Sequence, residues 1–310
     1  MMSAVFLSAS VPNRGDWIET AKPHEIRESV VALVATVLPE HELVFGGHPA
    51  ISPLVEHAAR SLGAASRVHI YQSRQFEGKI PEAALKFENF HWTDRKADQP
   101  SSLTHMRTEM LRSRKFLMAV FIGGMEGIND EYTMFREICP NKPAFAIGST
   151  GSASAKLLEV NRQESQDLGL YSELSVSKLY RSLFSKLVRQ AVTQEKTAAV
   201  LPILLEQDDR KLISSIWPVF KPLVSSGVLA GGSPSDVLEE WKAQVLLPAC
   251  NSAGEHGRAI LGLLFQPAHQ RAPQKVAVVA DFLRDVFRGK ELRDEDLTGL
   301  AVALLRMGIQ

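Results

Sequence analysis

Several features that mark other classes of protein are scarce in this chain of 310 residues, and each shortage excludes something. The two cysteines, Cys139 and Cys250, are too few and too far apart in sequence for a disulfide framework or a zinc site. We therefore expect packed thiols in a reducing compartment, with no bound metal and no cofactor. No apolar run reaches the roughly 18 residues of a membrane span and no leader-like segment is visible, so we expect a cytoplasmic protein without a membrane partner.

An excess of charge of one sign is also lacking. Lysine plus arginine and aspartate plus glutamate number 35 each, so no global positive field exists to gather DNA or RNA. Nucleic acid is therefore not the expected main partner. A hydrophobic content of 45% with 23% charged residues is typical of a globular protein with a substantial core, in one large or two ordinary domains.

The first part of the chain, up to about residue 190, alternates short β-type runs with longer amphipathic segments. This alternation predicts an α/β fold, a Rossmann-like doubly wound parallel sheet wrapped by helices. The expected strands are residues 4–7, 43–45, 68–71, 90–92, 116–122 and 144–147. The expected helices are residues 23–37, 51–62, 102–113, 129–138 and, closing this domain, 176–190.

The rest of the chain has helical segments and no convincing alternating strand. We predict one domain at residues 1–192 and a second, mainly α-helical domain at residues 198–310, with a polar joint at 193–197. The clearest helix of the second domain begins with Ser233 as N-cap, Pro234 at the first helical position and an acid in the first turn. Further helices are expected at residues 208–223, 258–264, 274–287 and 294–307.

The most informative segment is residues 121–132, where a hydrophobic strand runs into a glycine turn that opens a helix. Glycine lets a backbone bend tightly beside an anion, and the amides at the start of the following helix then point at that anion. Glu131, one turn into the helix, would face the same pocket. The segment therefore predicts a nucleotide-phosphate site, and its turn consists of Gly123, Gly124, Met125, Glu126 and Gly127.

Three other expected strands also end in small residues. Ligands of such sheets bind at the carboxyl ends of the strands. One glycine turn is more often structural than functional, but four turns at one edge of a sheet indicate a pocket. The three segments are Ser8-Ala9-Ser10, Gly46-Gly47-His48-Pro49-Ala50 and Gly148-Ser149-Thr150-Gly151.

Arg107 lies in the expected helix 102–113, which leads into the strand before the glycine turn. Together with Gly123, Gly124, Gly127 and Glu131, it resembles the SLOG superfamily, which groups the lonely-guy phosphoribohydrolases with related nucleotide-binding domains. The resemblance covers about residues 1–190. In the enzymatic members an arginine and a glutamate act at the ribosyl centre of a nucleoside 5'-monophosphate, and the resemblance gives these roles to Arg107 and Glu131.

The turn departs from the enzymatic pattern, which reads Pro-Gly-Gly-x-Gly-Thr-x-x-Glu. Ile122 precedes the glycines in place of proline, Met125 and Glu126 lengthen the turn, and Ile128 replaces threonine. These departures count against hydrolysis more than against nucleotide binding.

The segments at residues 6–12 and 44–51 look most like the SLOG branches of bacterial conflict systems. A similar domain senses a relative of cyclic ADP-ribose in Thoeris antiphage effectors. The resemblance thus implies a sensor for an NAD-derived or ADP-ribose-like ligand, with the C-terminal helices serving homo-oligomerisation or a protein partner. A nucleoside 5'-monophosphate phosphoribohydrolase and an adaptor with a vestigial pocket are the alternatives.

If a phosphorylated ribose binds, the amides of residues 46–48 and 124–127 would hold its phosphates and Arg107 would add a charged contact. Glu131 would accept hydrogen bonds from ribose hydroxyls or, in a hydrolase, act at the anomeric carbon. A salt bridge between Arg107 and Glu131 on the helix surface is the structural alternative. Glu126 is ambiguous, because an acid in the turn repels phosphate but suits hydroxyl or base recognition.

Other candidates have structural alternatives of similar weight. His48 would contact phosphate or base, or else Pro49 begins the next helix and backbone geometry explains the motif. Arg14 is near enough to a strand end to reach an anion, as is Arg74, although a solvated loop is the favoured reading for both. Surface positions are expected for Asp94 and Arg95, and core positions for Trp217, Phe220 and Trp241.

Overall fold

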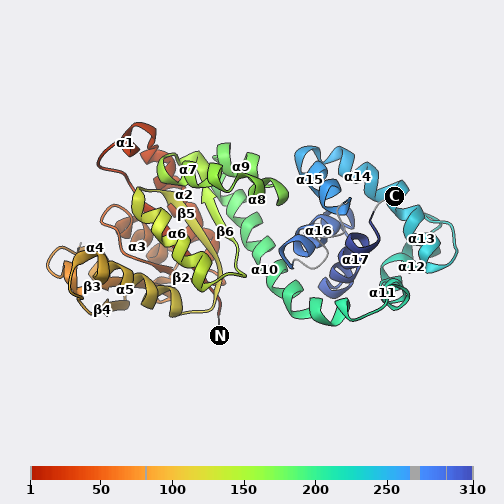
Figure 1. Cartoon of the computed structure of the whole chain (residues 1–310), viewed down its shortest axis with the longest axis horizontal. Coiled ribbons are helices and arrows are strands. Elements are labelled where there is room, and N and C mark those ends of the chain that lie inside the picture. Colours follow the sequence, from red (N-terminus) through yellow and green to blue (C-terminus); the bar gives the residue numbers. More distant parts are fainter. Residues whose placement is uncertain (1, 81, 266–272, 291, 309–310) are drawn as a thin grey trace. The chain divides into compact units, whose positions relative to one another are not determined.

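The computed structural model describes residues 2–80, 82–265, 273–290 and 292–308 of the chain (Figure 1). The chain divides into two compact units. Unit 1 consists of Met1–Arg162 and Ser172–Val188, and unit 2 consists of Gln163–Tyr171 and Arg189–Gln310. No helix among the described residues is both long enough and apolar enough to cross a membrane.

Unit 1 contains a six-stranded sheet in the order β4-β3-β2-β1-β5-β6, and every neighbouring pair is parallel. The strand order reverses between β1 and β5, which makes this the topological switch point of the sheet. The predicted α/β, Rossmann-like fold with a helical C-terminal region is confirmed. The strands are β1 Ala4–Ser10, β2 Glu42–Phe45, β3 Val68–Ser73, β4 Asn89–Thr93, β5 Phe116–Gly123 and β6 Ala144–Ile147.

The central strands are buried on both faces, which explains why they read as continuous apolar runs. All eight residues of β5 are buried, as are the first five of β1. Phe6 of β1 is enclosed by three aromatic rings, with ring centroids 6.1 Å from Phe116, 6.1 Å from Phe121 and 5.9 Å from Phe135. This cluster holds β1, β5 and the following helix together in one core.

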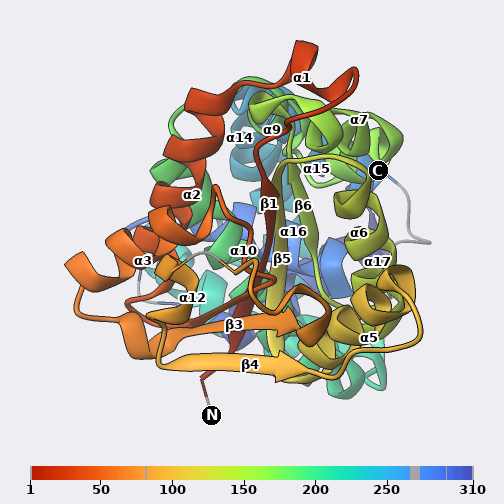
Figure 2. The same cartoon turned by 90° about the vertical axis from the view of Figure 1, so that its left-hand side faces the viewer.

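Helices cover both faces of the sheet. Figure 2 shows α2 (Pro23–Val37) and α3 (Ser52–Ser61) on one side, with α5 (Gln99–Arg112) and α6 (Glu126–Ile138) on the other. The prediction for residues 23–37 matches α2 at both ends, whereas α6 begins three residues earlier than predicted. The shorter elements of unit 1 include α1 (Trp17–Thr20), η1 (Ala65–Arg67), η2 (Arg74–Phe76), α4 (Glu82–Leu85), η3 (Gly148–Thr150), α7 (Ser152–Val160) and α9 (Tyr171–Val176).

The polar joint predicted at residues 193–197 is wrong, because these residues are helical. They belong to α10 (Tyr180–Leu205), which runs on from the predicted closing helix. The segment Thr193-Gln194-Glu195-Lys196-Thr197 has no glycine or proline, and its glutamine, glutamate and lysine are good helix formers. Thr193 and Thr197 are buried, so the polar composition reflects one covered and one exposed helix face.

Unit 2 is helical around α17 (Asp294–Met307), whose residues from Leu297 to Leu305 are all buried. The helix predicted at residues 208–223 is broken at Ile216 into α11 and α12, where Pro218 lies in the first turn of the second helix. Trp241 is fully buried and stacks on Phe287 at 5.2 Å, as a core position requires.

The capping expected at Ser233 is present, since its hydroxyl accepts from the Asp236 amide and the Asp236 carboxylate accepts from the Ser233 amide. The remaining elements of this region are α8 Arg162–Asp167, α11 Asp209–Ser215, α12 Trp217–Ser225, α13 Pro234–Trp241, the π-helical segment η4 Lys242–Leu246, α14 Leu247–Ser252, α15 Gly254–Leu264 and α16 Pro273–Val286.

Candidate functional site

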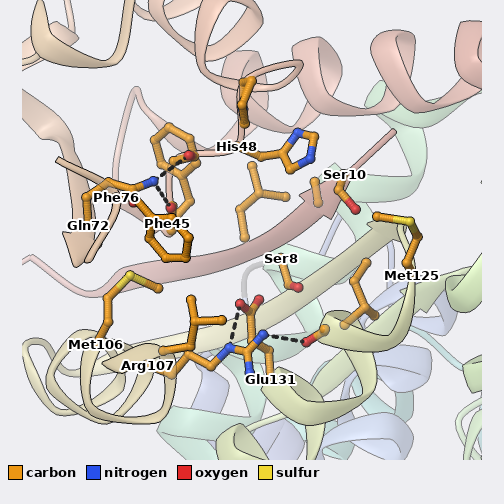
Figure 3. Close-up of a pocket in the computed structure, with 18 of the residues that line it drawn as sticks. Ser8, Ser10, Phe45, His48, Gln72, Phe76, Met106, Arg107, Met125 and Glu131 are labelled. Carbon is orange, nitrogen blue, oxygen red and sulfur yellow. Dashed lines mark hydrogen bonds and ion pairs between the residues drawn. The ribbon is translucent and has the colours of Figure 1, made fainter. Parts of the chain in front are cut away.

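A cavity of about 470 Å³ lies in unit 1 at the carboxyl ends of β1, β2 and β3, beside the start of α6 (Figure 3). This is the edge of the sheet where the switch between β1 and β5 leaves a crevice, the usual ligand position in doubly wound folds. The predicted site residues that line it are Ser8, Ala9, Ser10, Arg14, Gly46, Gly47, His48, Arg107, Met125, Glu126, Gly127 and Glu131. The predicted site residues outside its lining are Gly123, Gly124, Gly148 and Ser149.

Gly123 ends β5 and Gly124 follows it, and the amides of both glycines are bonded within the fold. Gly123 has φ +61° and Gly124 has φ +81°, so both adopt a left-handed backbone that favours glycine. The Gly123 amide donates to Thr150 Oγ1 at 2.9 Å, and the Gly124 amide donates to the Ser10 carbonyl at 2.9 Å. The Gly124 amide, expected to hold phosphate, is therefore bound within the fold.

Amides that could face a ligand lie at the start of α6, since those of Gly123 and Gly124 are bonded within the fold. Met125 is the N-cap and Glu126 is the first helical residue, so the acid expected inside the turn lies in the first turn of the helix. The first amides of a helix have no intrahelical acceptor and favour a nearby negative charge. Gly127 leaves room for Arg107, because a Cβ there would lie 2.9 Å from Arg107 Nη2.

Arg107 and Glu131 form an ion pair that connects α5 and α6 at the cavity wall. Arg107 Nε donates to Glu131 Oε1 at 3.2 Å, and Arg107 Nη1 contacts Asp130 Oδ2 at 3.1 Å. The side chains of Arg107 and Glu131 are only 12% and 16% exposed, so the pair is not the surface salt bridge of the structural alternative. The arginine is held by carboxylates, and its predicted contact with phosphate would compete with them.

Glu131 is a partly buried acid with mixed surroundings. Burial raises the pKa of Glu131 above its usual range, while the charge of Arg107 and hydrogen bonds from Ser8 and Arg107 oppose that rise. Ser8 is 3% exposed at the end of β1, directly beside the carboxyl group. Such a carboxyl suits either hydrogen bonding to sugar hydroxyls or proton transfer.

His48 lines the cavity, and one of its ring nitrogens is bonded to the backbone. Its Nδ1 accepts from the Ala50 amide at 3.2 Å, which leaves the proton of the neutral ring on Nε2. Burial lowers the pKa of His48, so the neutral form is favoured. The alternative in which Pro49 begins the next helix is not what the structure has, because α3 begins at Ser52.

Exposed charges form the rim of the cavity. Glu126 accepts a hydrogen bond from Trp17 Nε1 at 2.8 Å and pairs with Arg14 at 3.5 Å, which connects the loop after β1 to the start of α6. The hydrogen bond from Trp17, followed by a backbone hydrogen bond and then the charge of Arg14, lowers the pKa of Glu126. Arg74 does not line the cavity, since it pairs with Glu77 and lies over the Trp92 ring at 5.5 Å.

The predicted strand end after β6 serves the fold. Ser149 is buried and donates to the Tyr180 hydroxyl at 3.3 Å. Thr150 Oγ1 donates to the Ile147 carbonyl at 2.6 Å and accepts from the Gly123 amide. Thr150 therefore braces the turn, and Ser149 packs against Tyr180 of the closing helix. Asp94 and Arg95 are exposed, as expected. No cluster of metal-ligating side chains occurs among the described residues.

Comparison with known proteins agrees with this geometry. The model of the SLOG cluster3 family matches residues 16–184, more than half of the chain. The chain belongs to the SLOG cluster3 family. The match supports a SLOG-type, nucleotide-related domain and includes Arg107, the glycine turn and Glu131. A search of curated proteins found no match.

The SLOG domain also has cavity residues that the sequence did not reveal. Gln72 is the next-to-last residue of β3, just beyond the predicted strand, and a polar residue near a strand end was the available signal. Phe76, at the end of η2, and Lys79, in the loop after it, follow in a segment with no periodic sequence pattern. The further lining residues are Leu7, Phe45, Pro49, Ile80, Leu103, Met106 and Ile128.

Proposed function

We propose that the chain is a sensor that binds a nucleotide-derived signal, of NAD-derived or ADP-ribose-like chemistry, in the cavity of its SLOG domain. One observation carries this proposal: the cavity lies at the switch point and combines an apolar end with a partly buried acid and the first turn of α6. These surroundings suit the base, the ribose and the phosphates of one ligand. Its volume of about 470 Å³ lies within the usual range for small-molecule sites.

The chemistry of the turn favours recognition over cleavage. Ile128, 4% exposed, presents an apolar side chain where the enzymatic pattern has threonine. Glu131 is already engaged by Arg107 and Ser8, which suits an acceptor held in place for ribose hydroxyls. The motifs shared with conflict-system SLOG domains support a role in bacterial antiphage defence, and the helical unit 2 would transmit binding through homo-oligomerisation or a protein partner.

The first test is binding by the full chain. Calorimetry and thermal shift with ADP-ribose, cyclic ADP-ribose, NAD and AMP should identify at least one ligand. A ligand at 100 times its Kd should add about 2.7 kcal/mol to the free energy of unfolding. We expect Arg107→Ala to weaken binding at least about tenfold, because Glu131 loses its positioning partner. Arg112→Ala, an exposed arginine on the same helix and outside the cavity lining, is the matched control.

A phosphoribohydrolase is the second candidate, favoured by the burial that raises the pKa of Glu131. A carboxyl with a raised pKa can act as a general acid near neutral pH. Incubation with AMP and water would then yield adenine and ribose 5-phosphate. Release that disappears in Glu131→Ala would overturn the sensor proposal. If none of the four nucleotides binds, an adaptor with a vestigial pocket is the better description.

A further inference from the structure

Gln72, near the end of β3, has its side-chain amide fixed by the neighbouring glycine loop. Its Nε2 donates to the Gly46 carbonyl at 2.7 Å and to the Gly47 carbonyl at 2.5 Å. Both partners are acceptors, so the atom that faces them is the amide nitrogen. Gly47, with φ +65°, permits this approach, since a Cβ there would lie 2.8 Å from Gln72 Nε2 and 2.9 Å from Ile70 Cδ1.

Because Nε2 is committed, the atom that Gln72 still offers to a ligand is the acceptor Oε1. Gln72 is 7% exposed and lines the cavity. Within the described part of the chain, no hydrogen bond to Oε1 accompanies the two made by Nε2. Oε1 is therefore free to accept a hydrogen bond from a ligand that supplies an N–H in the cavity.

The surroundings of Gln72 are apolar. Phe45 precedes the glycine loop and packs edge-on against Phe87 at 6.0 Å. Met106 covers the loop from α5, with its Cε 3.6 Å from where a Gly46 Cβ would lie. Figure 3 shows Phe45, Phe76 and Met106 on the same side of the cavity as Gln72, away from Ser10 and Met125. An apolar wall with one fixed acceptor matches a flat heterocycle that carries an N–H donor on its edge.

We propose that the end of the cavity formed by Phe45, Gln72, Phe76 and Met106 is a base subsite that selects a base with an exocyclic amino group. The amino group donates to Gln72 Oε1. This inference rests on the proposed function, and it adds a rule for which nucleotides bind. Hypoxanthine has a carbonyl where adenine has its amino group, so two acceptors would face each other and the inosine form of a ligand would be rejected.

The test compares two probes on the unaltered full chain. ADP-ribose and inosine diphosphoribose differ only in the base edge, and calorimetry gives both Kd values. We expect the inosine form to bind about tenfold more weakly or worse, the usual consequence of an unpaired group in a site built for a hydrogen bond. Equal affinities would overturn the base subsite and leave the sensor proposal intact. Absence of binding by both would overturn the base subsite, whereas the sensor proposal is overturned only if cyclic ADP-ribose, NAD and AMP also fail to bind.

A pair of variants assigns the preference to one residue. Gln72→Met keeps the length of the side chain but removes Oε1, so the ratio of the two Kd values should fall to about twofold or less. Gln75→Met is the matched control, because Gln75 lies three residues further on and outside the cavity lining, and its ratio should stay at the value of the unaltered chain. An unchanged ratio in Gln72→Met would contradict the assignment. If Gln72→Met does not fold, the two-probe comparison still decides.

Discussion

Two arginine–glutamate pairs lie at opposite ends of the sheet in unit 1. At the carboxyl ends, Arg107 Nε donates to Glu131 Oε1 at 3.2 Å. At the amino ends, Arg114, just before β5, donates from Nε to Glu42 Oε2 at 3.1 Å. The arginine and glutamate are 12% and 16% exposed in the first pair, and 31% and 24% in the second. By charge and distance the pairs are alike, yet only the first borders the cavity.

The difference lies in what surrounds each pair. At the amino ends, aromatic rings occupy the space: Arg114 Nη2 lies 3.1 Å from His69 Nδ1, and the His69 and His91 rings stack with centroids 5.5 Å apart. At the carboxyl ends, glycines stand where side chains would otherwise reach into the crevice. An acid paired with an arginine is therefore no sign of a ligand site by itself, whereas the same pair beside small residues at a switch point is.

The largest effect should come from filling the turn at the carboxyl ends. In Gly123→Ala the new Cβ would lie 2.4 Å from Ile26 Cδ1 and 2.9 Å from the Ser10 carbonyl, in a backbone with φ +61°. Because Ile26 and β1 are part of the packed core, we expect a loss of about 3 kcal/mol in the free energy of unfolding. Urea titration of the full chain measures it.

A glycine near the amino ends provides the control. Gly63, in the loop before β3, has φ +65° but nothing within 4 Å of a Cβ. Gly63→Ala should therefore lose only the backbone contribution, about 1 kcal/mol. Equal losses in the two variants would mean that the turn after β5 is no more tightly packed than an open loop.

The next largest effect separates the two glutamates by function. Glu131→Gln removes the charge that holds Arg107 and replaces one carboxylate oxygen, an acceptor for ribose hydroxyls, by an amide donor, so ADP-ribose should bind at least about tenfold more weakly. Glu42→Gln should leave that affinity unchanged and cost about 1 kcal/mol of stability through its pair with Arg114. Calorimetry and urea titration test both. Weaker binding in Glu42→Gln would show that the two pairs are coupled across the sheet.

The pH dependence of stability should have opposite signs at the two ends. Burial, followed by the charge of Arg114, lowers the pKa of His69 and of His91 below the ordinary 6.5, so the folded chain binds fewer protons there than the unfolded chain. The contribution of the two neutral histidines to the free energy of unfolding is intact above the ordinary pKa of 6.5 and is lost as pH falls below that value. Burial instead raises the pKa of Glu131 above 4.5, so its contribution improves as pH falls through the folded-state value.

The variants that separate these contributions are His69→Gln and Glu131→Gln, compared by urea midpoint at pH 7.5 and 5.5. The His69 variant should lose less stability on acidification than the unaltered chain. The Glu131 variant should lose more, because the improvement at low pH is removed. The same slope in all three proteins would exclude these two groups as the source of the pH dependence.

The sequence predicts only part of the difference between the two ends of the sheet. The apolar run before Gly123 and the small residues after β1 and β2 indicated the cavity edge, because strands buried on both faces have a clear pattern. The sequence predicts a later start for α6 because Gly127 resembles a turn residue. Gly127 is nevertheless helical, and glycine is tolerated there because amides in the first turn need no intrahelical acceptor. The amide commitments of Gly123 and Gly124 depend on Ser10 and Thr150, which are distant in sequence.

The remaining gaps have the same origin. Gln72 gains its role from two glycine carbonyls on the neighbouring strand end, and a contact between strands leaves no local pattern. The histidine cluster went unnoticed because His69 and His91 are aligned only by the pairing of β3 with β4. The polarity of residues 193–197 favours a joint, but polarity on one face is equally compatible with a helix.

The smallest effect concerns the exposed rim, where the two ends should differ only in binding. Arg14, beside the cavity, and Arg60, at the end of α3, are similarly exposed, with side chains 73% and 68% accessible. Exposed ion pairs contribute little to stability, so neither Arg14→Gln nor Arg60→Gln should move the urea midpoint measurably. Arg14→Gln should nevertheless weaken ADP-ribose binding about threefold at low salt, and the difference should vanish in 1 M salt, where charges are screened beyond about 3 Å. A salt-independent loss would mean that Arg14 acts through its contact with Glu126 and the shape of the rim, and not through its charge.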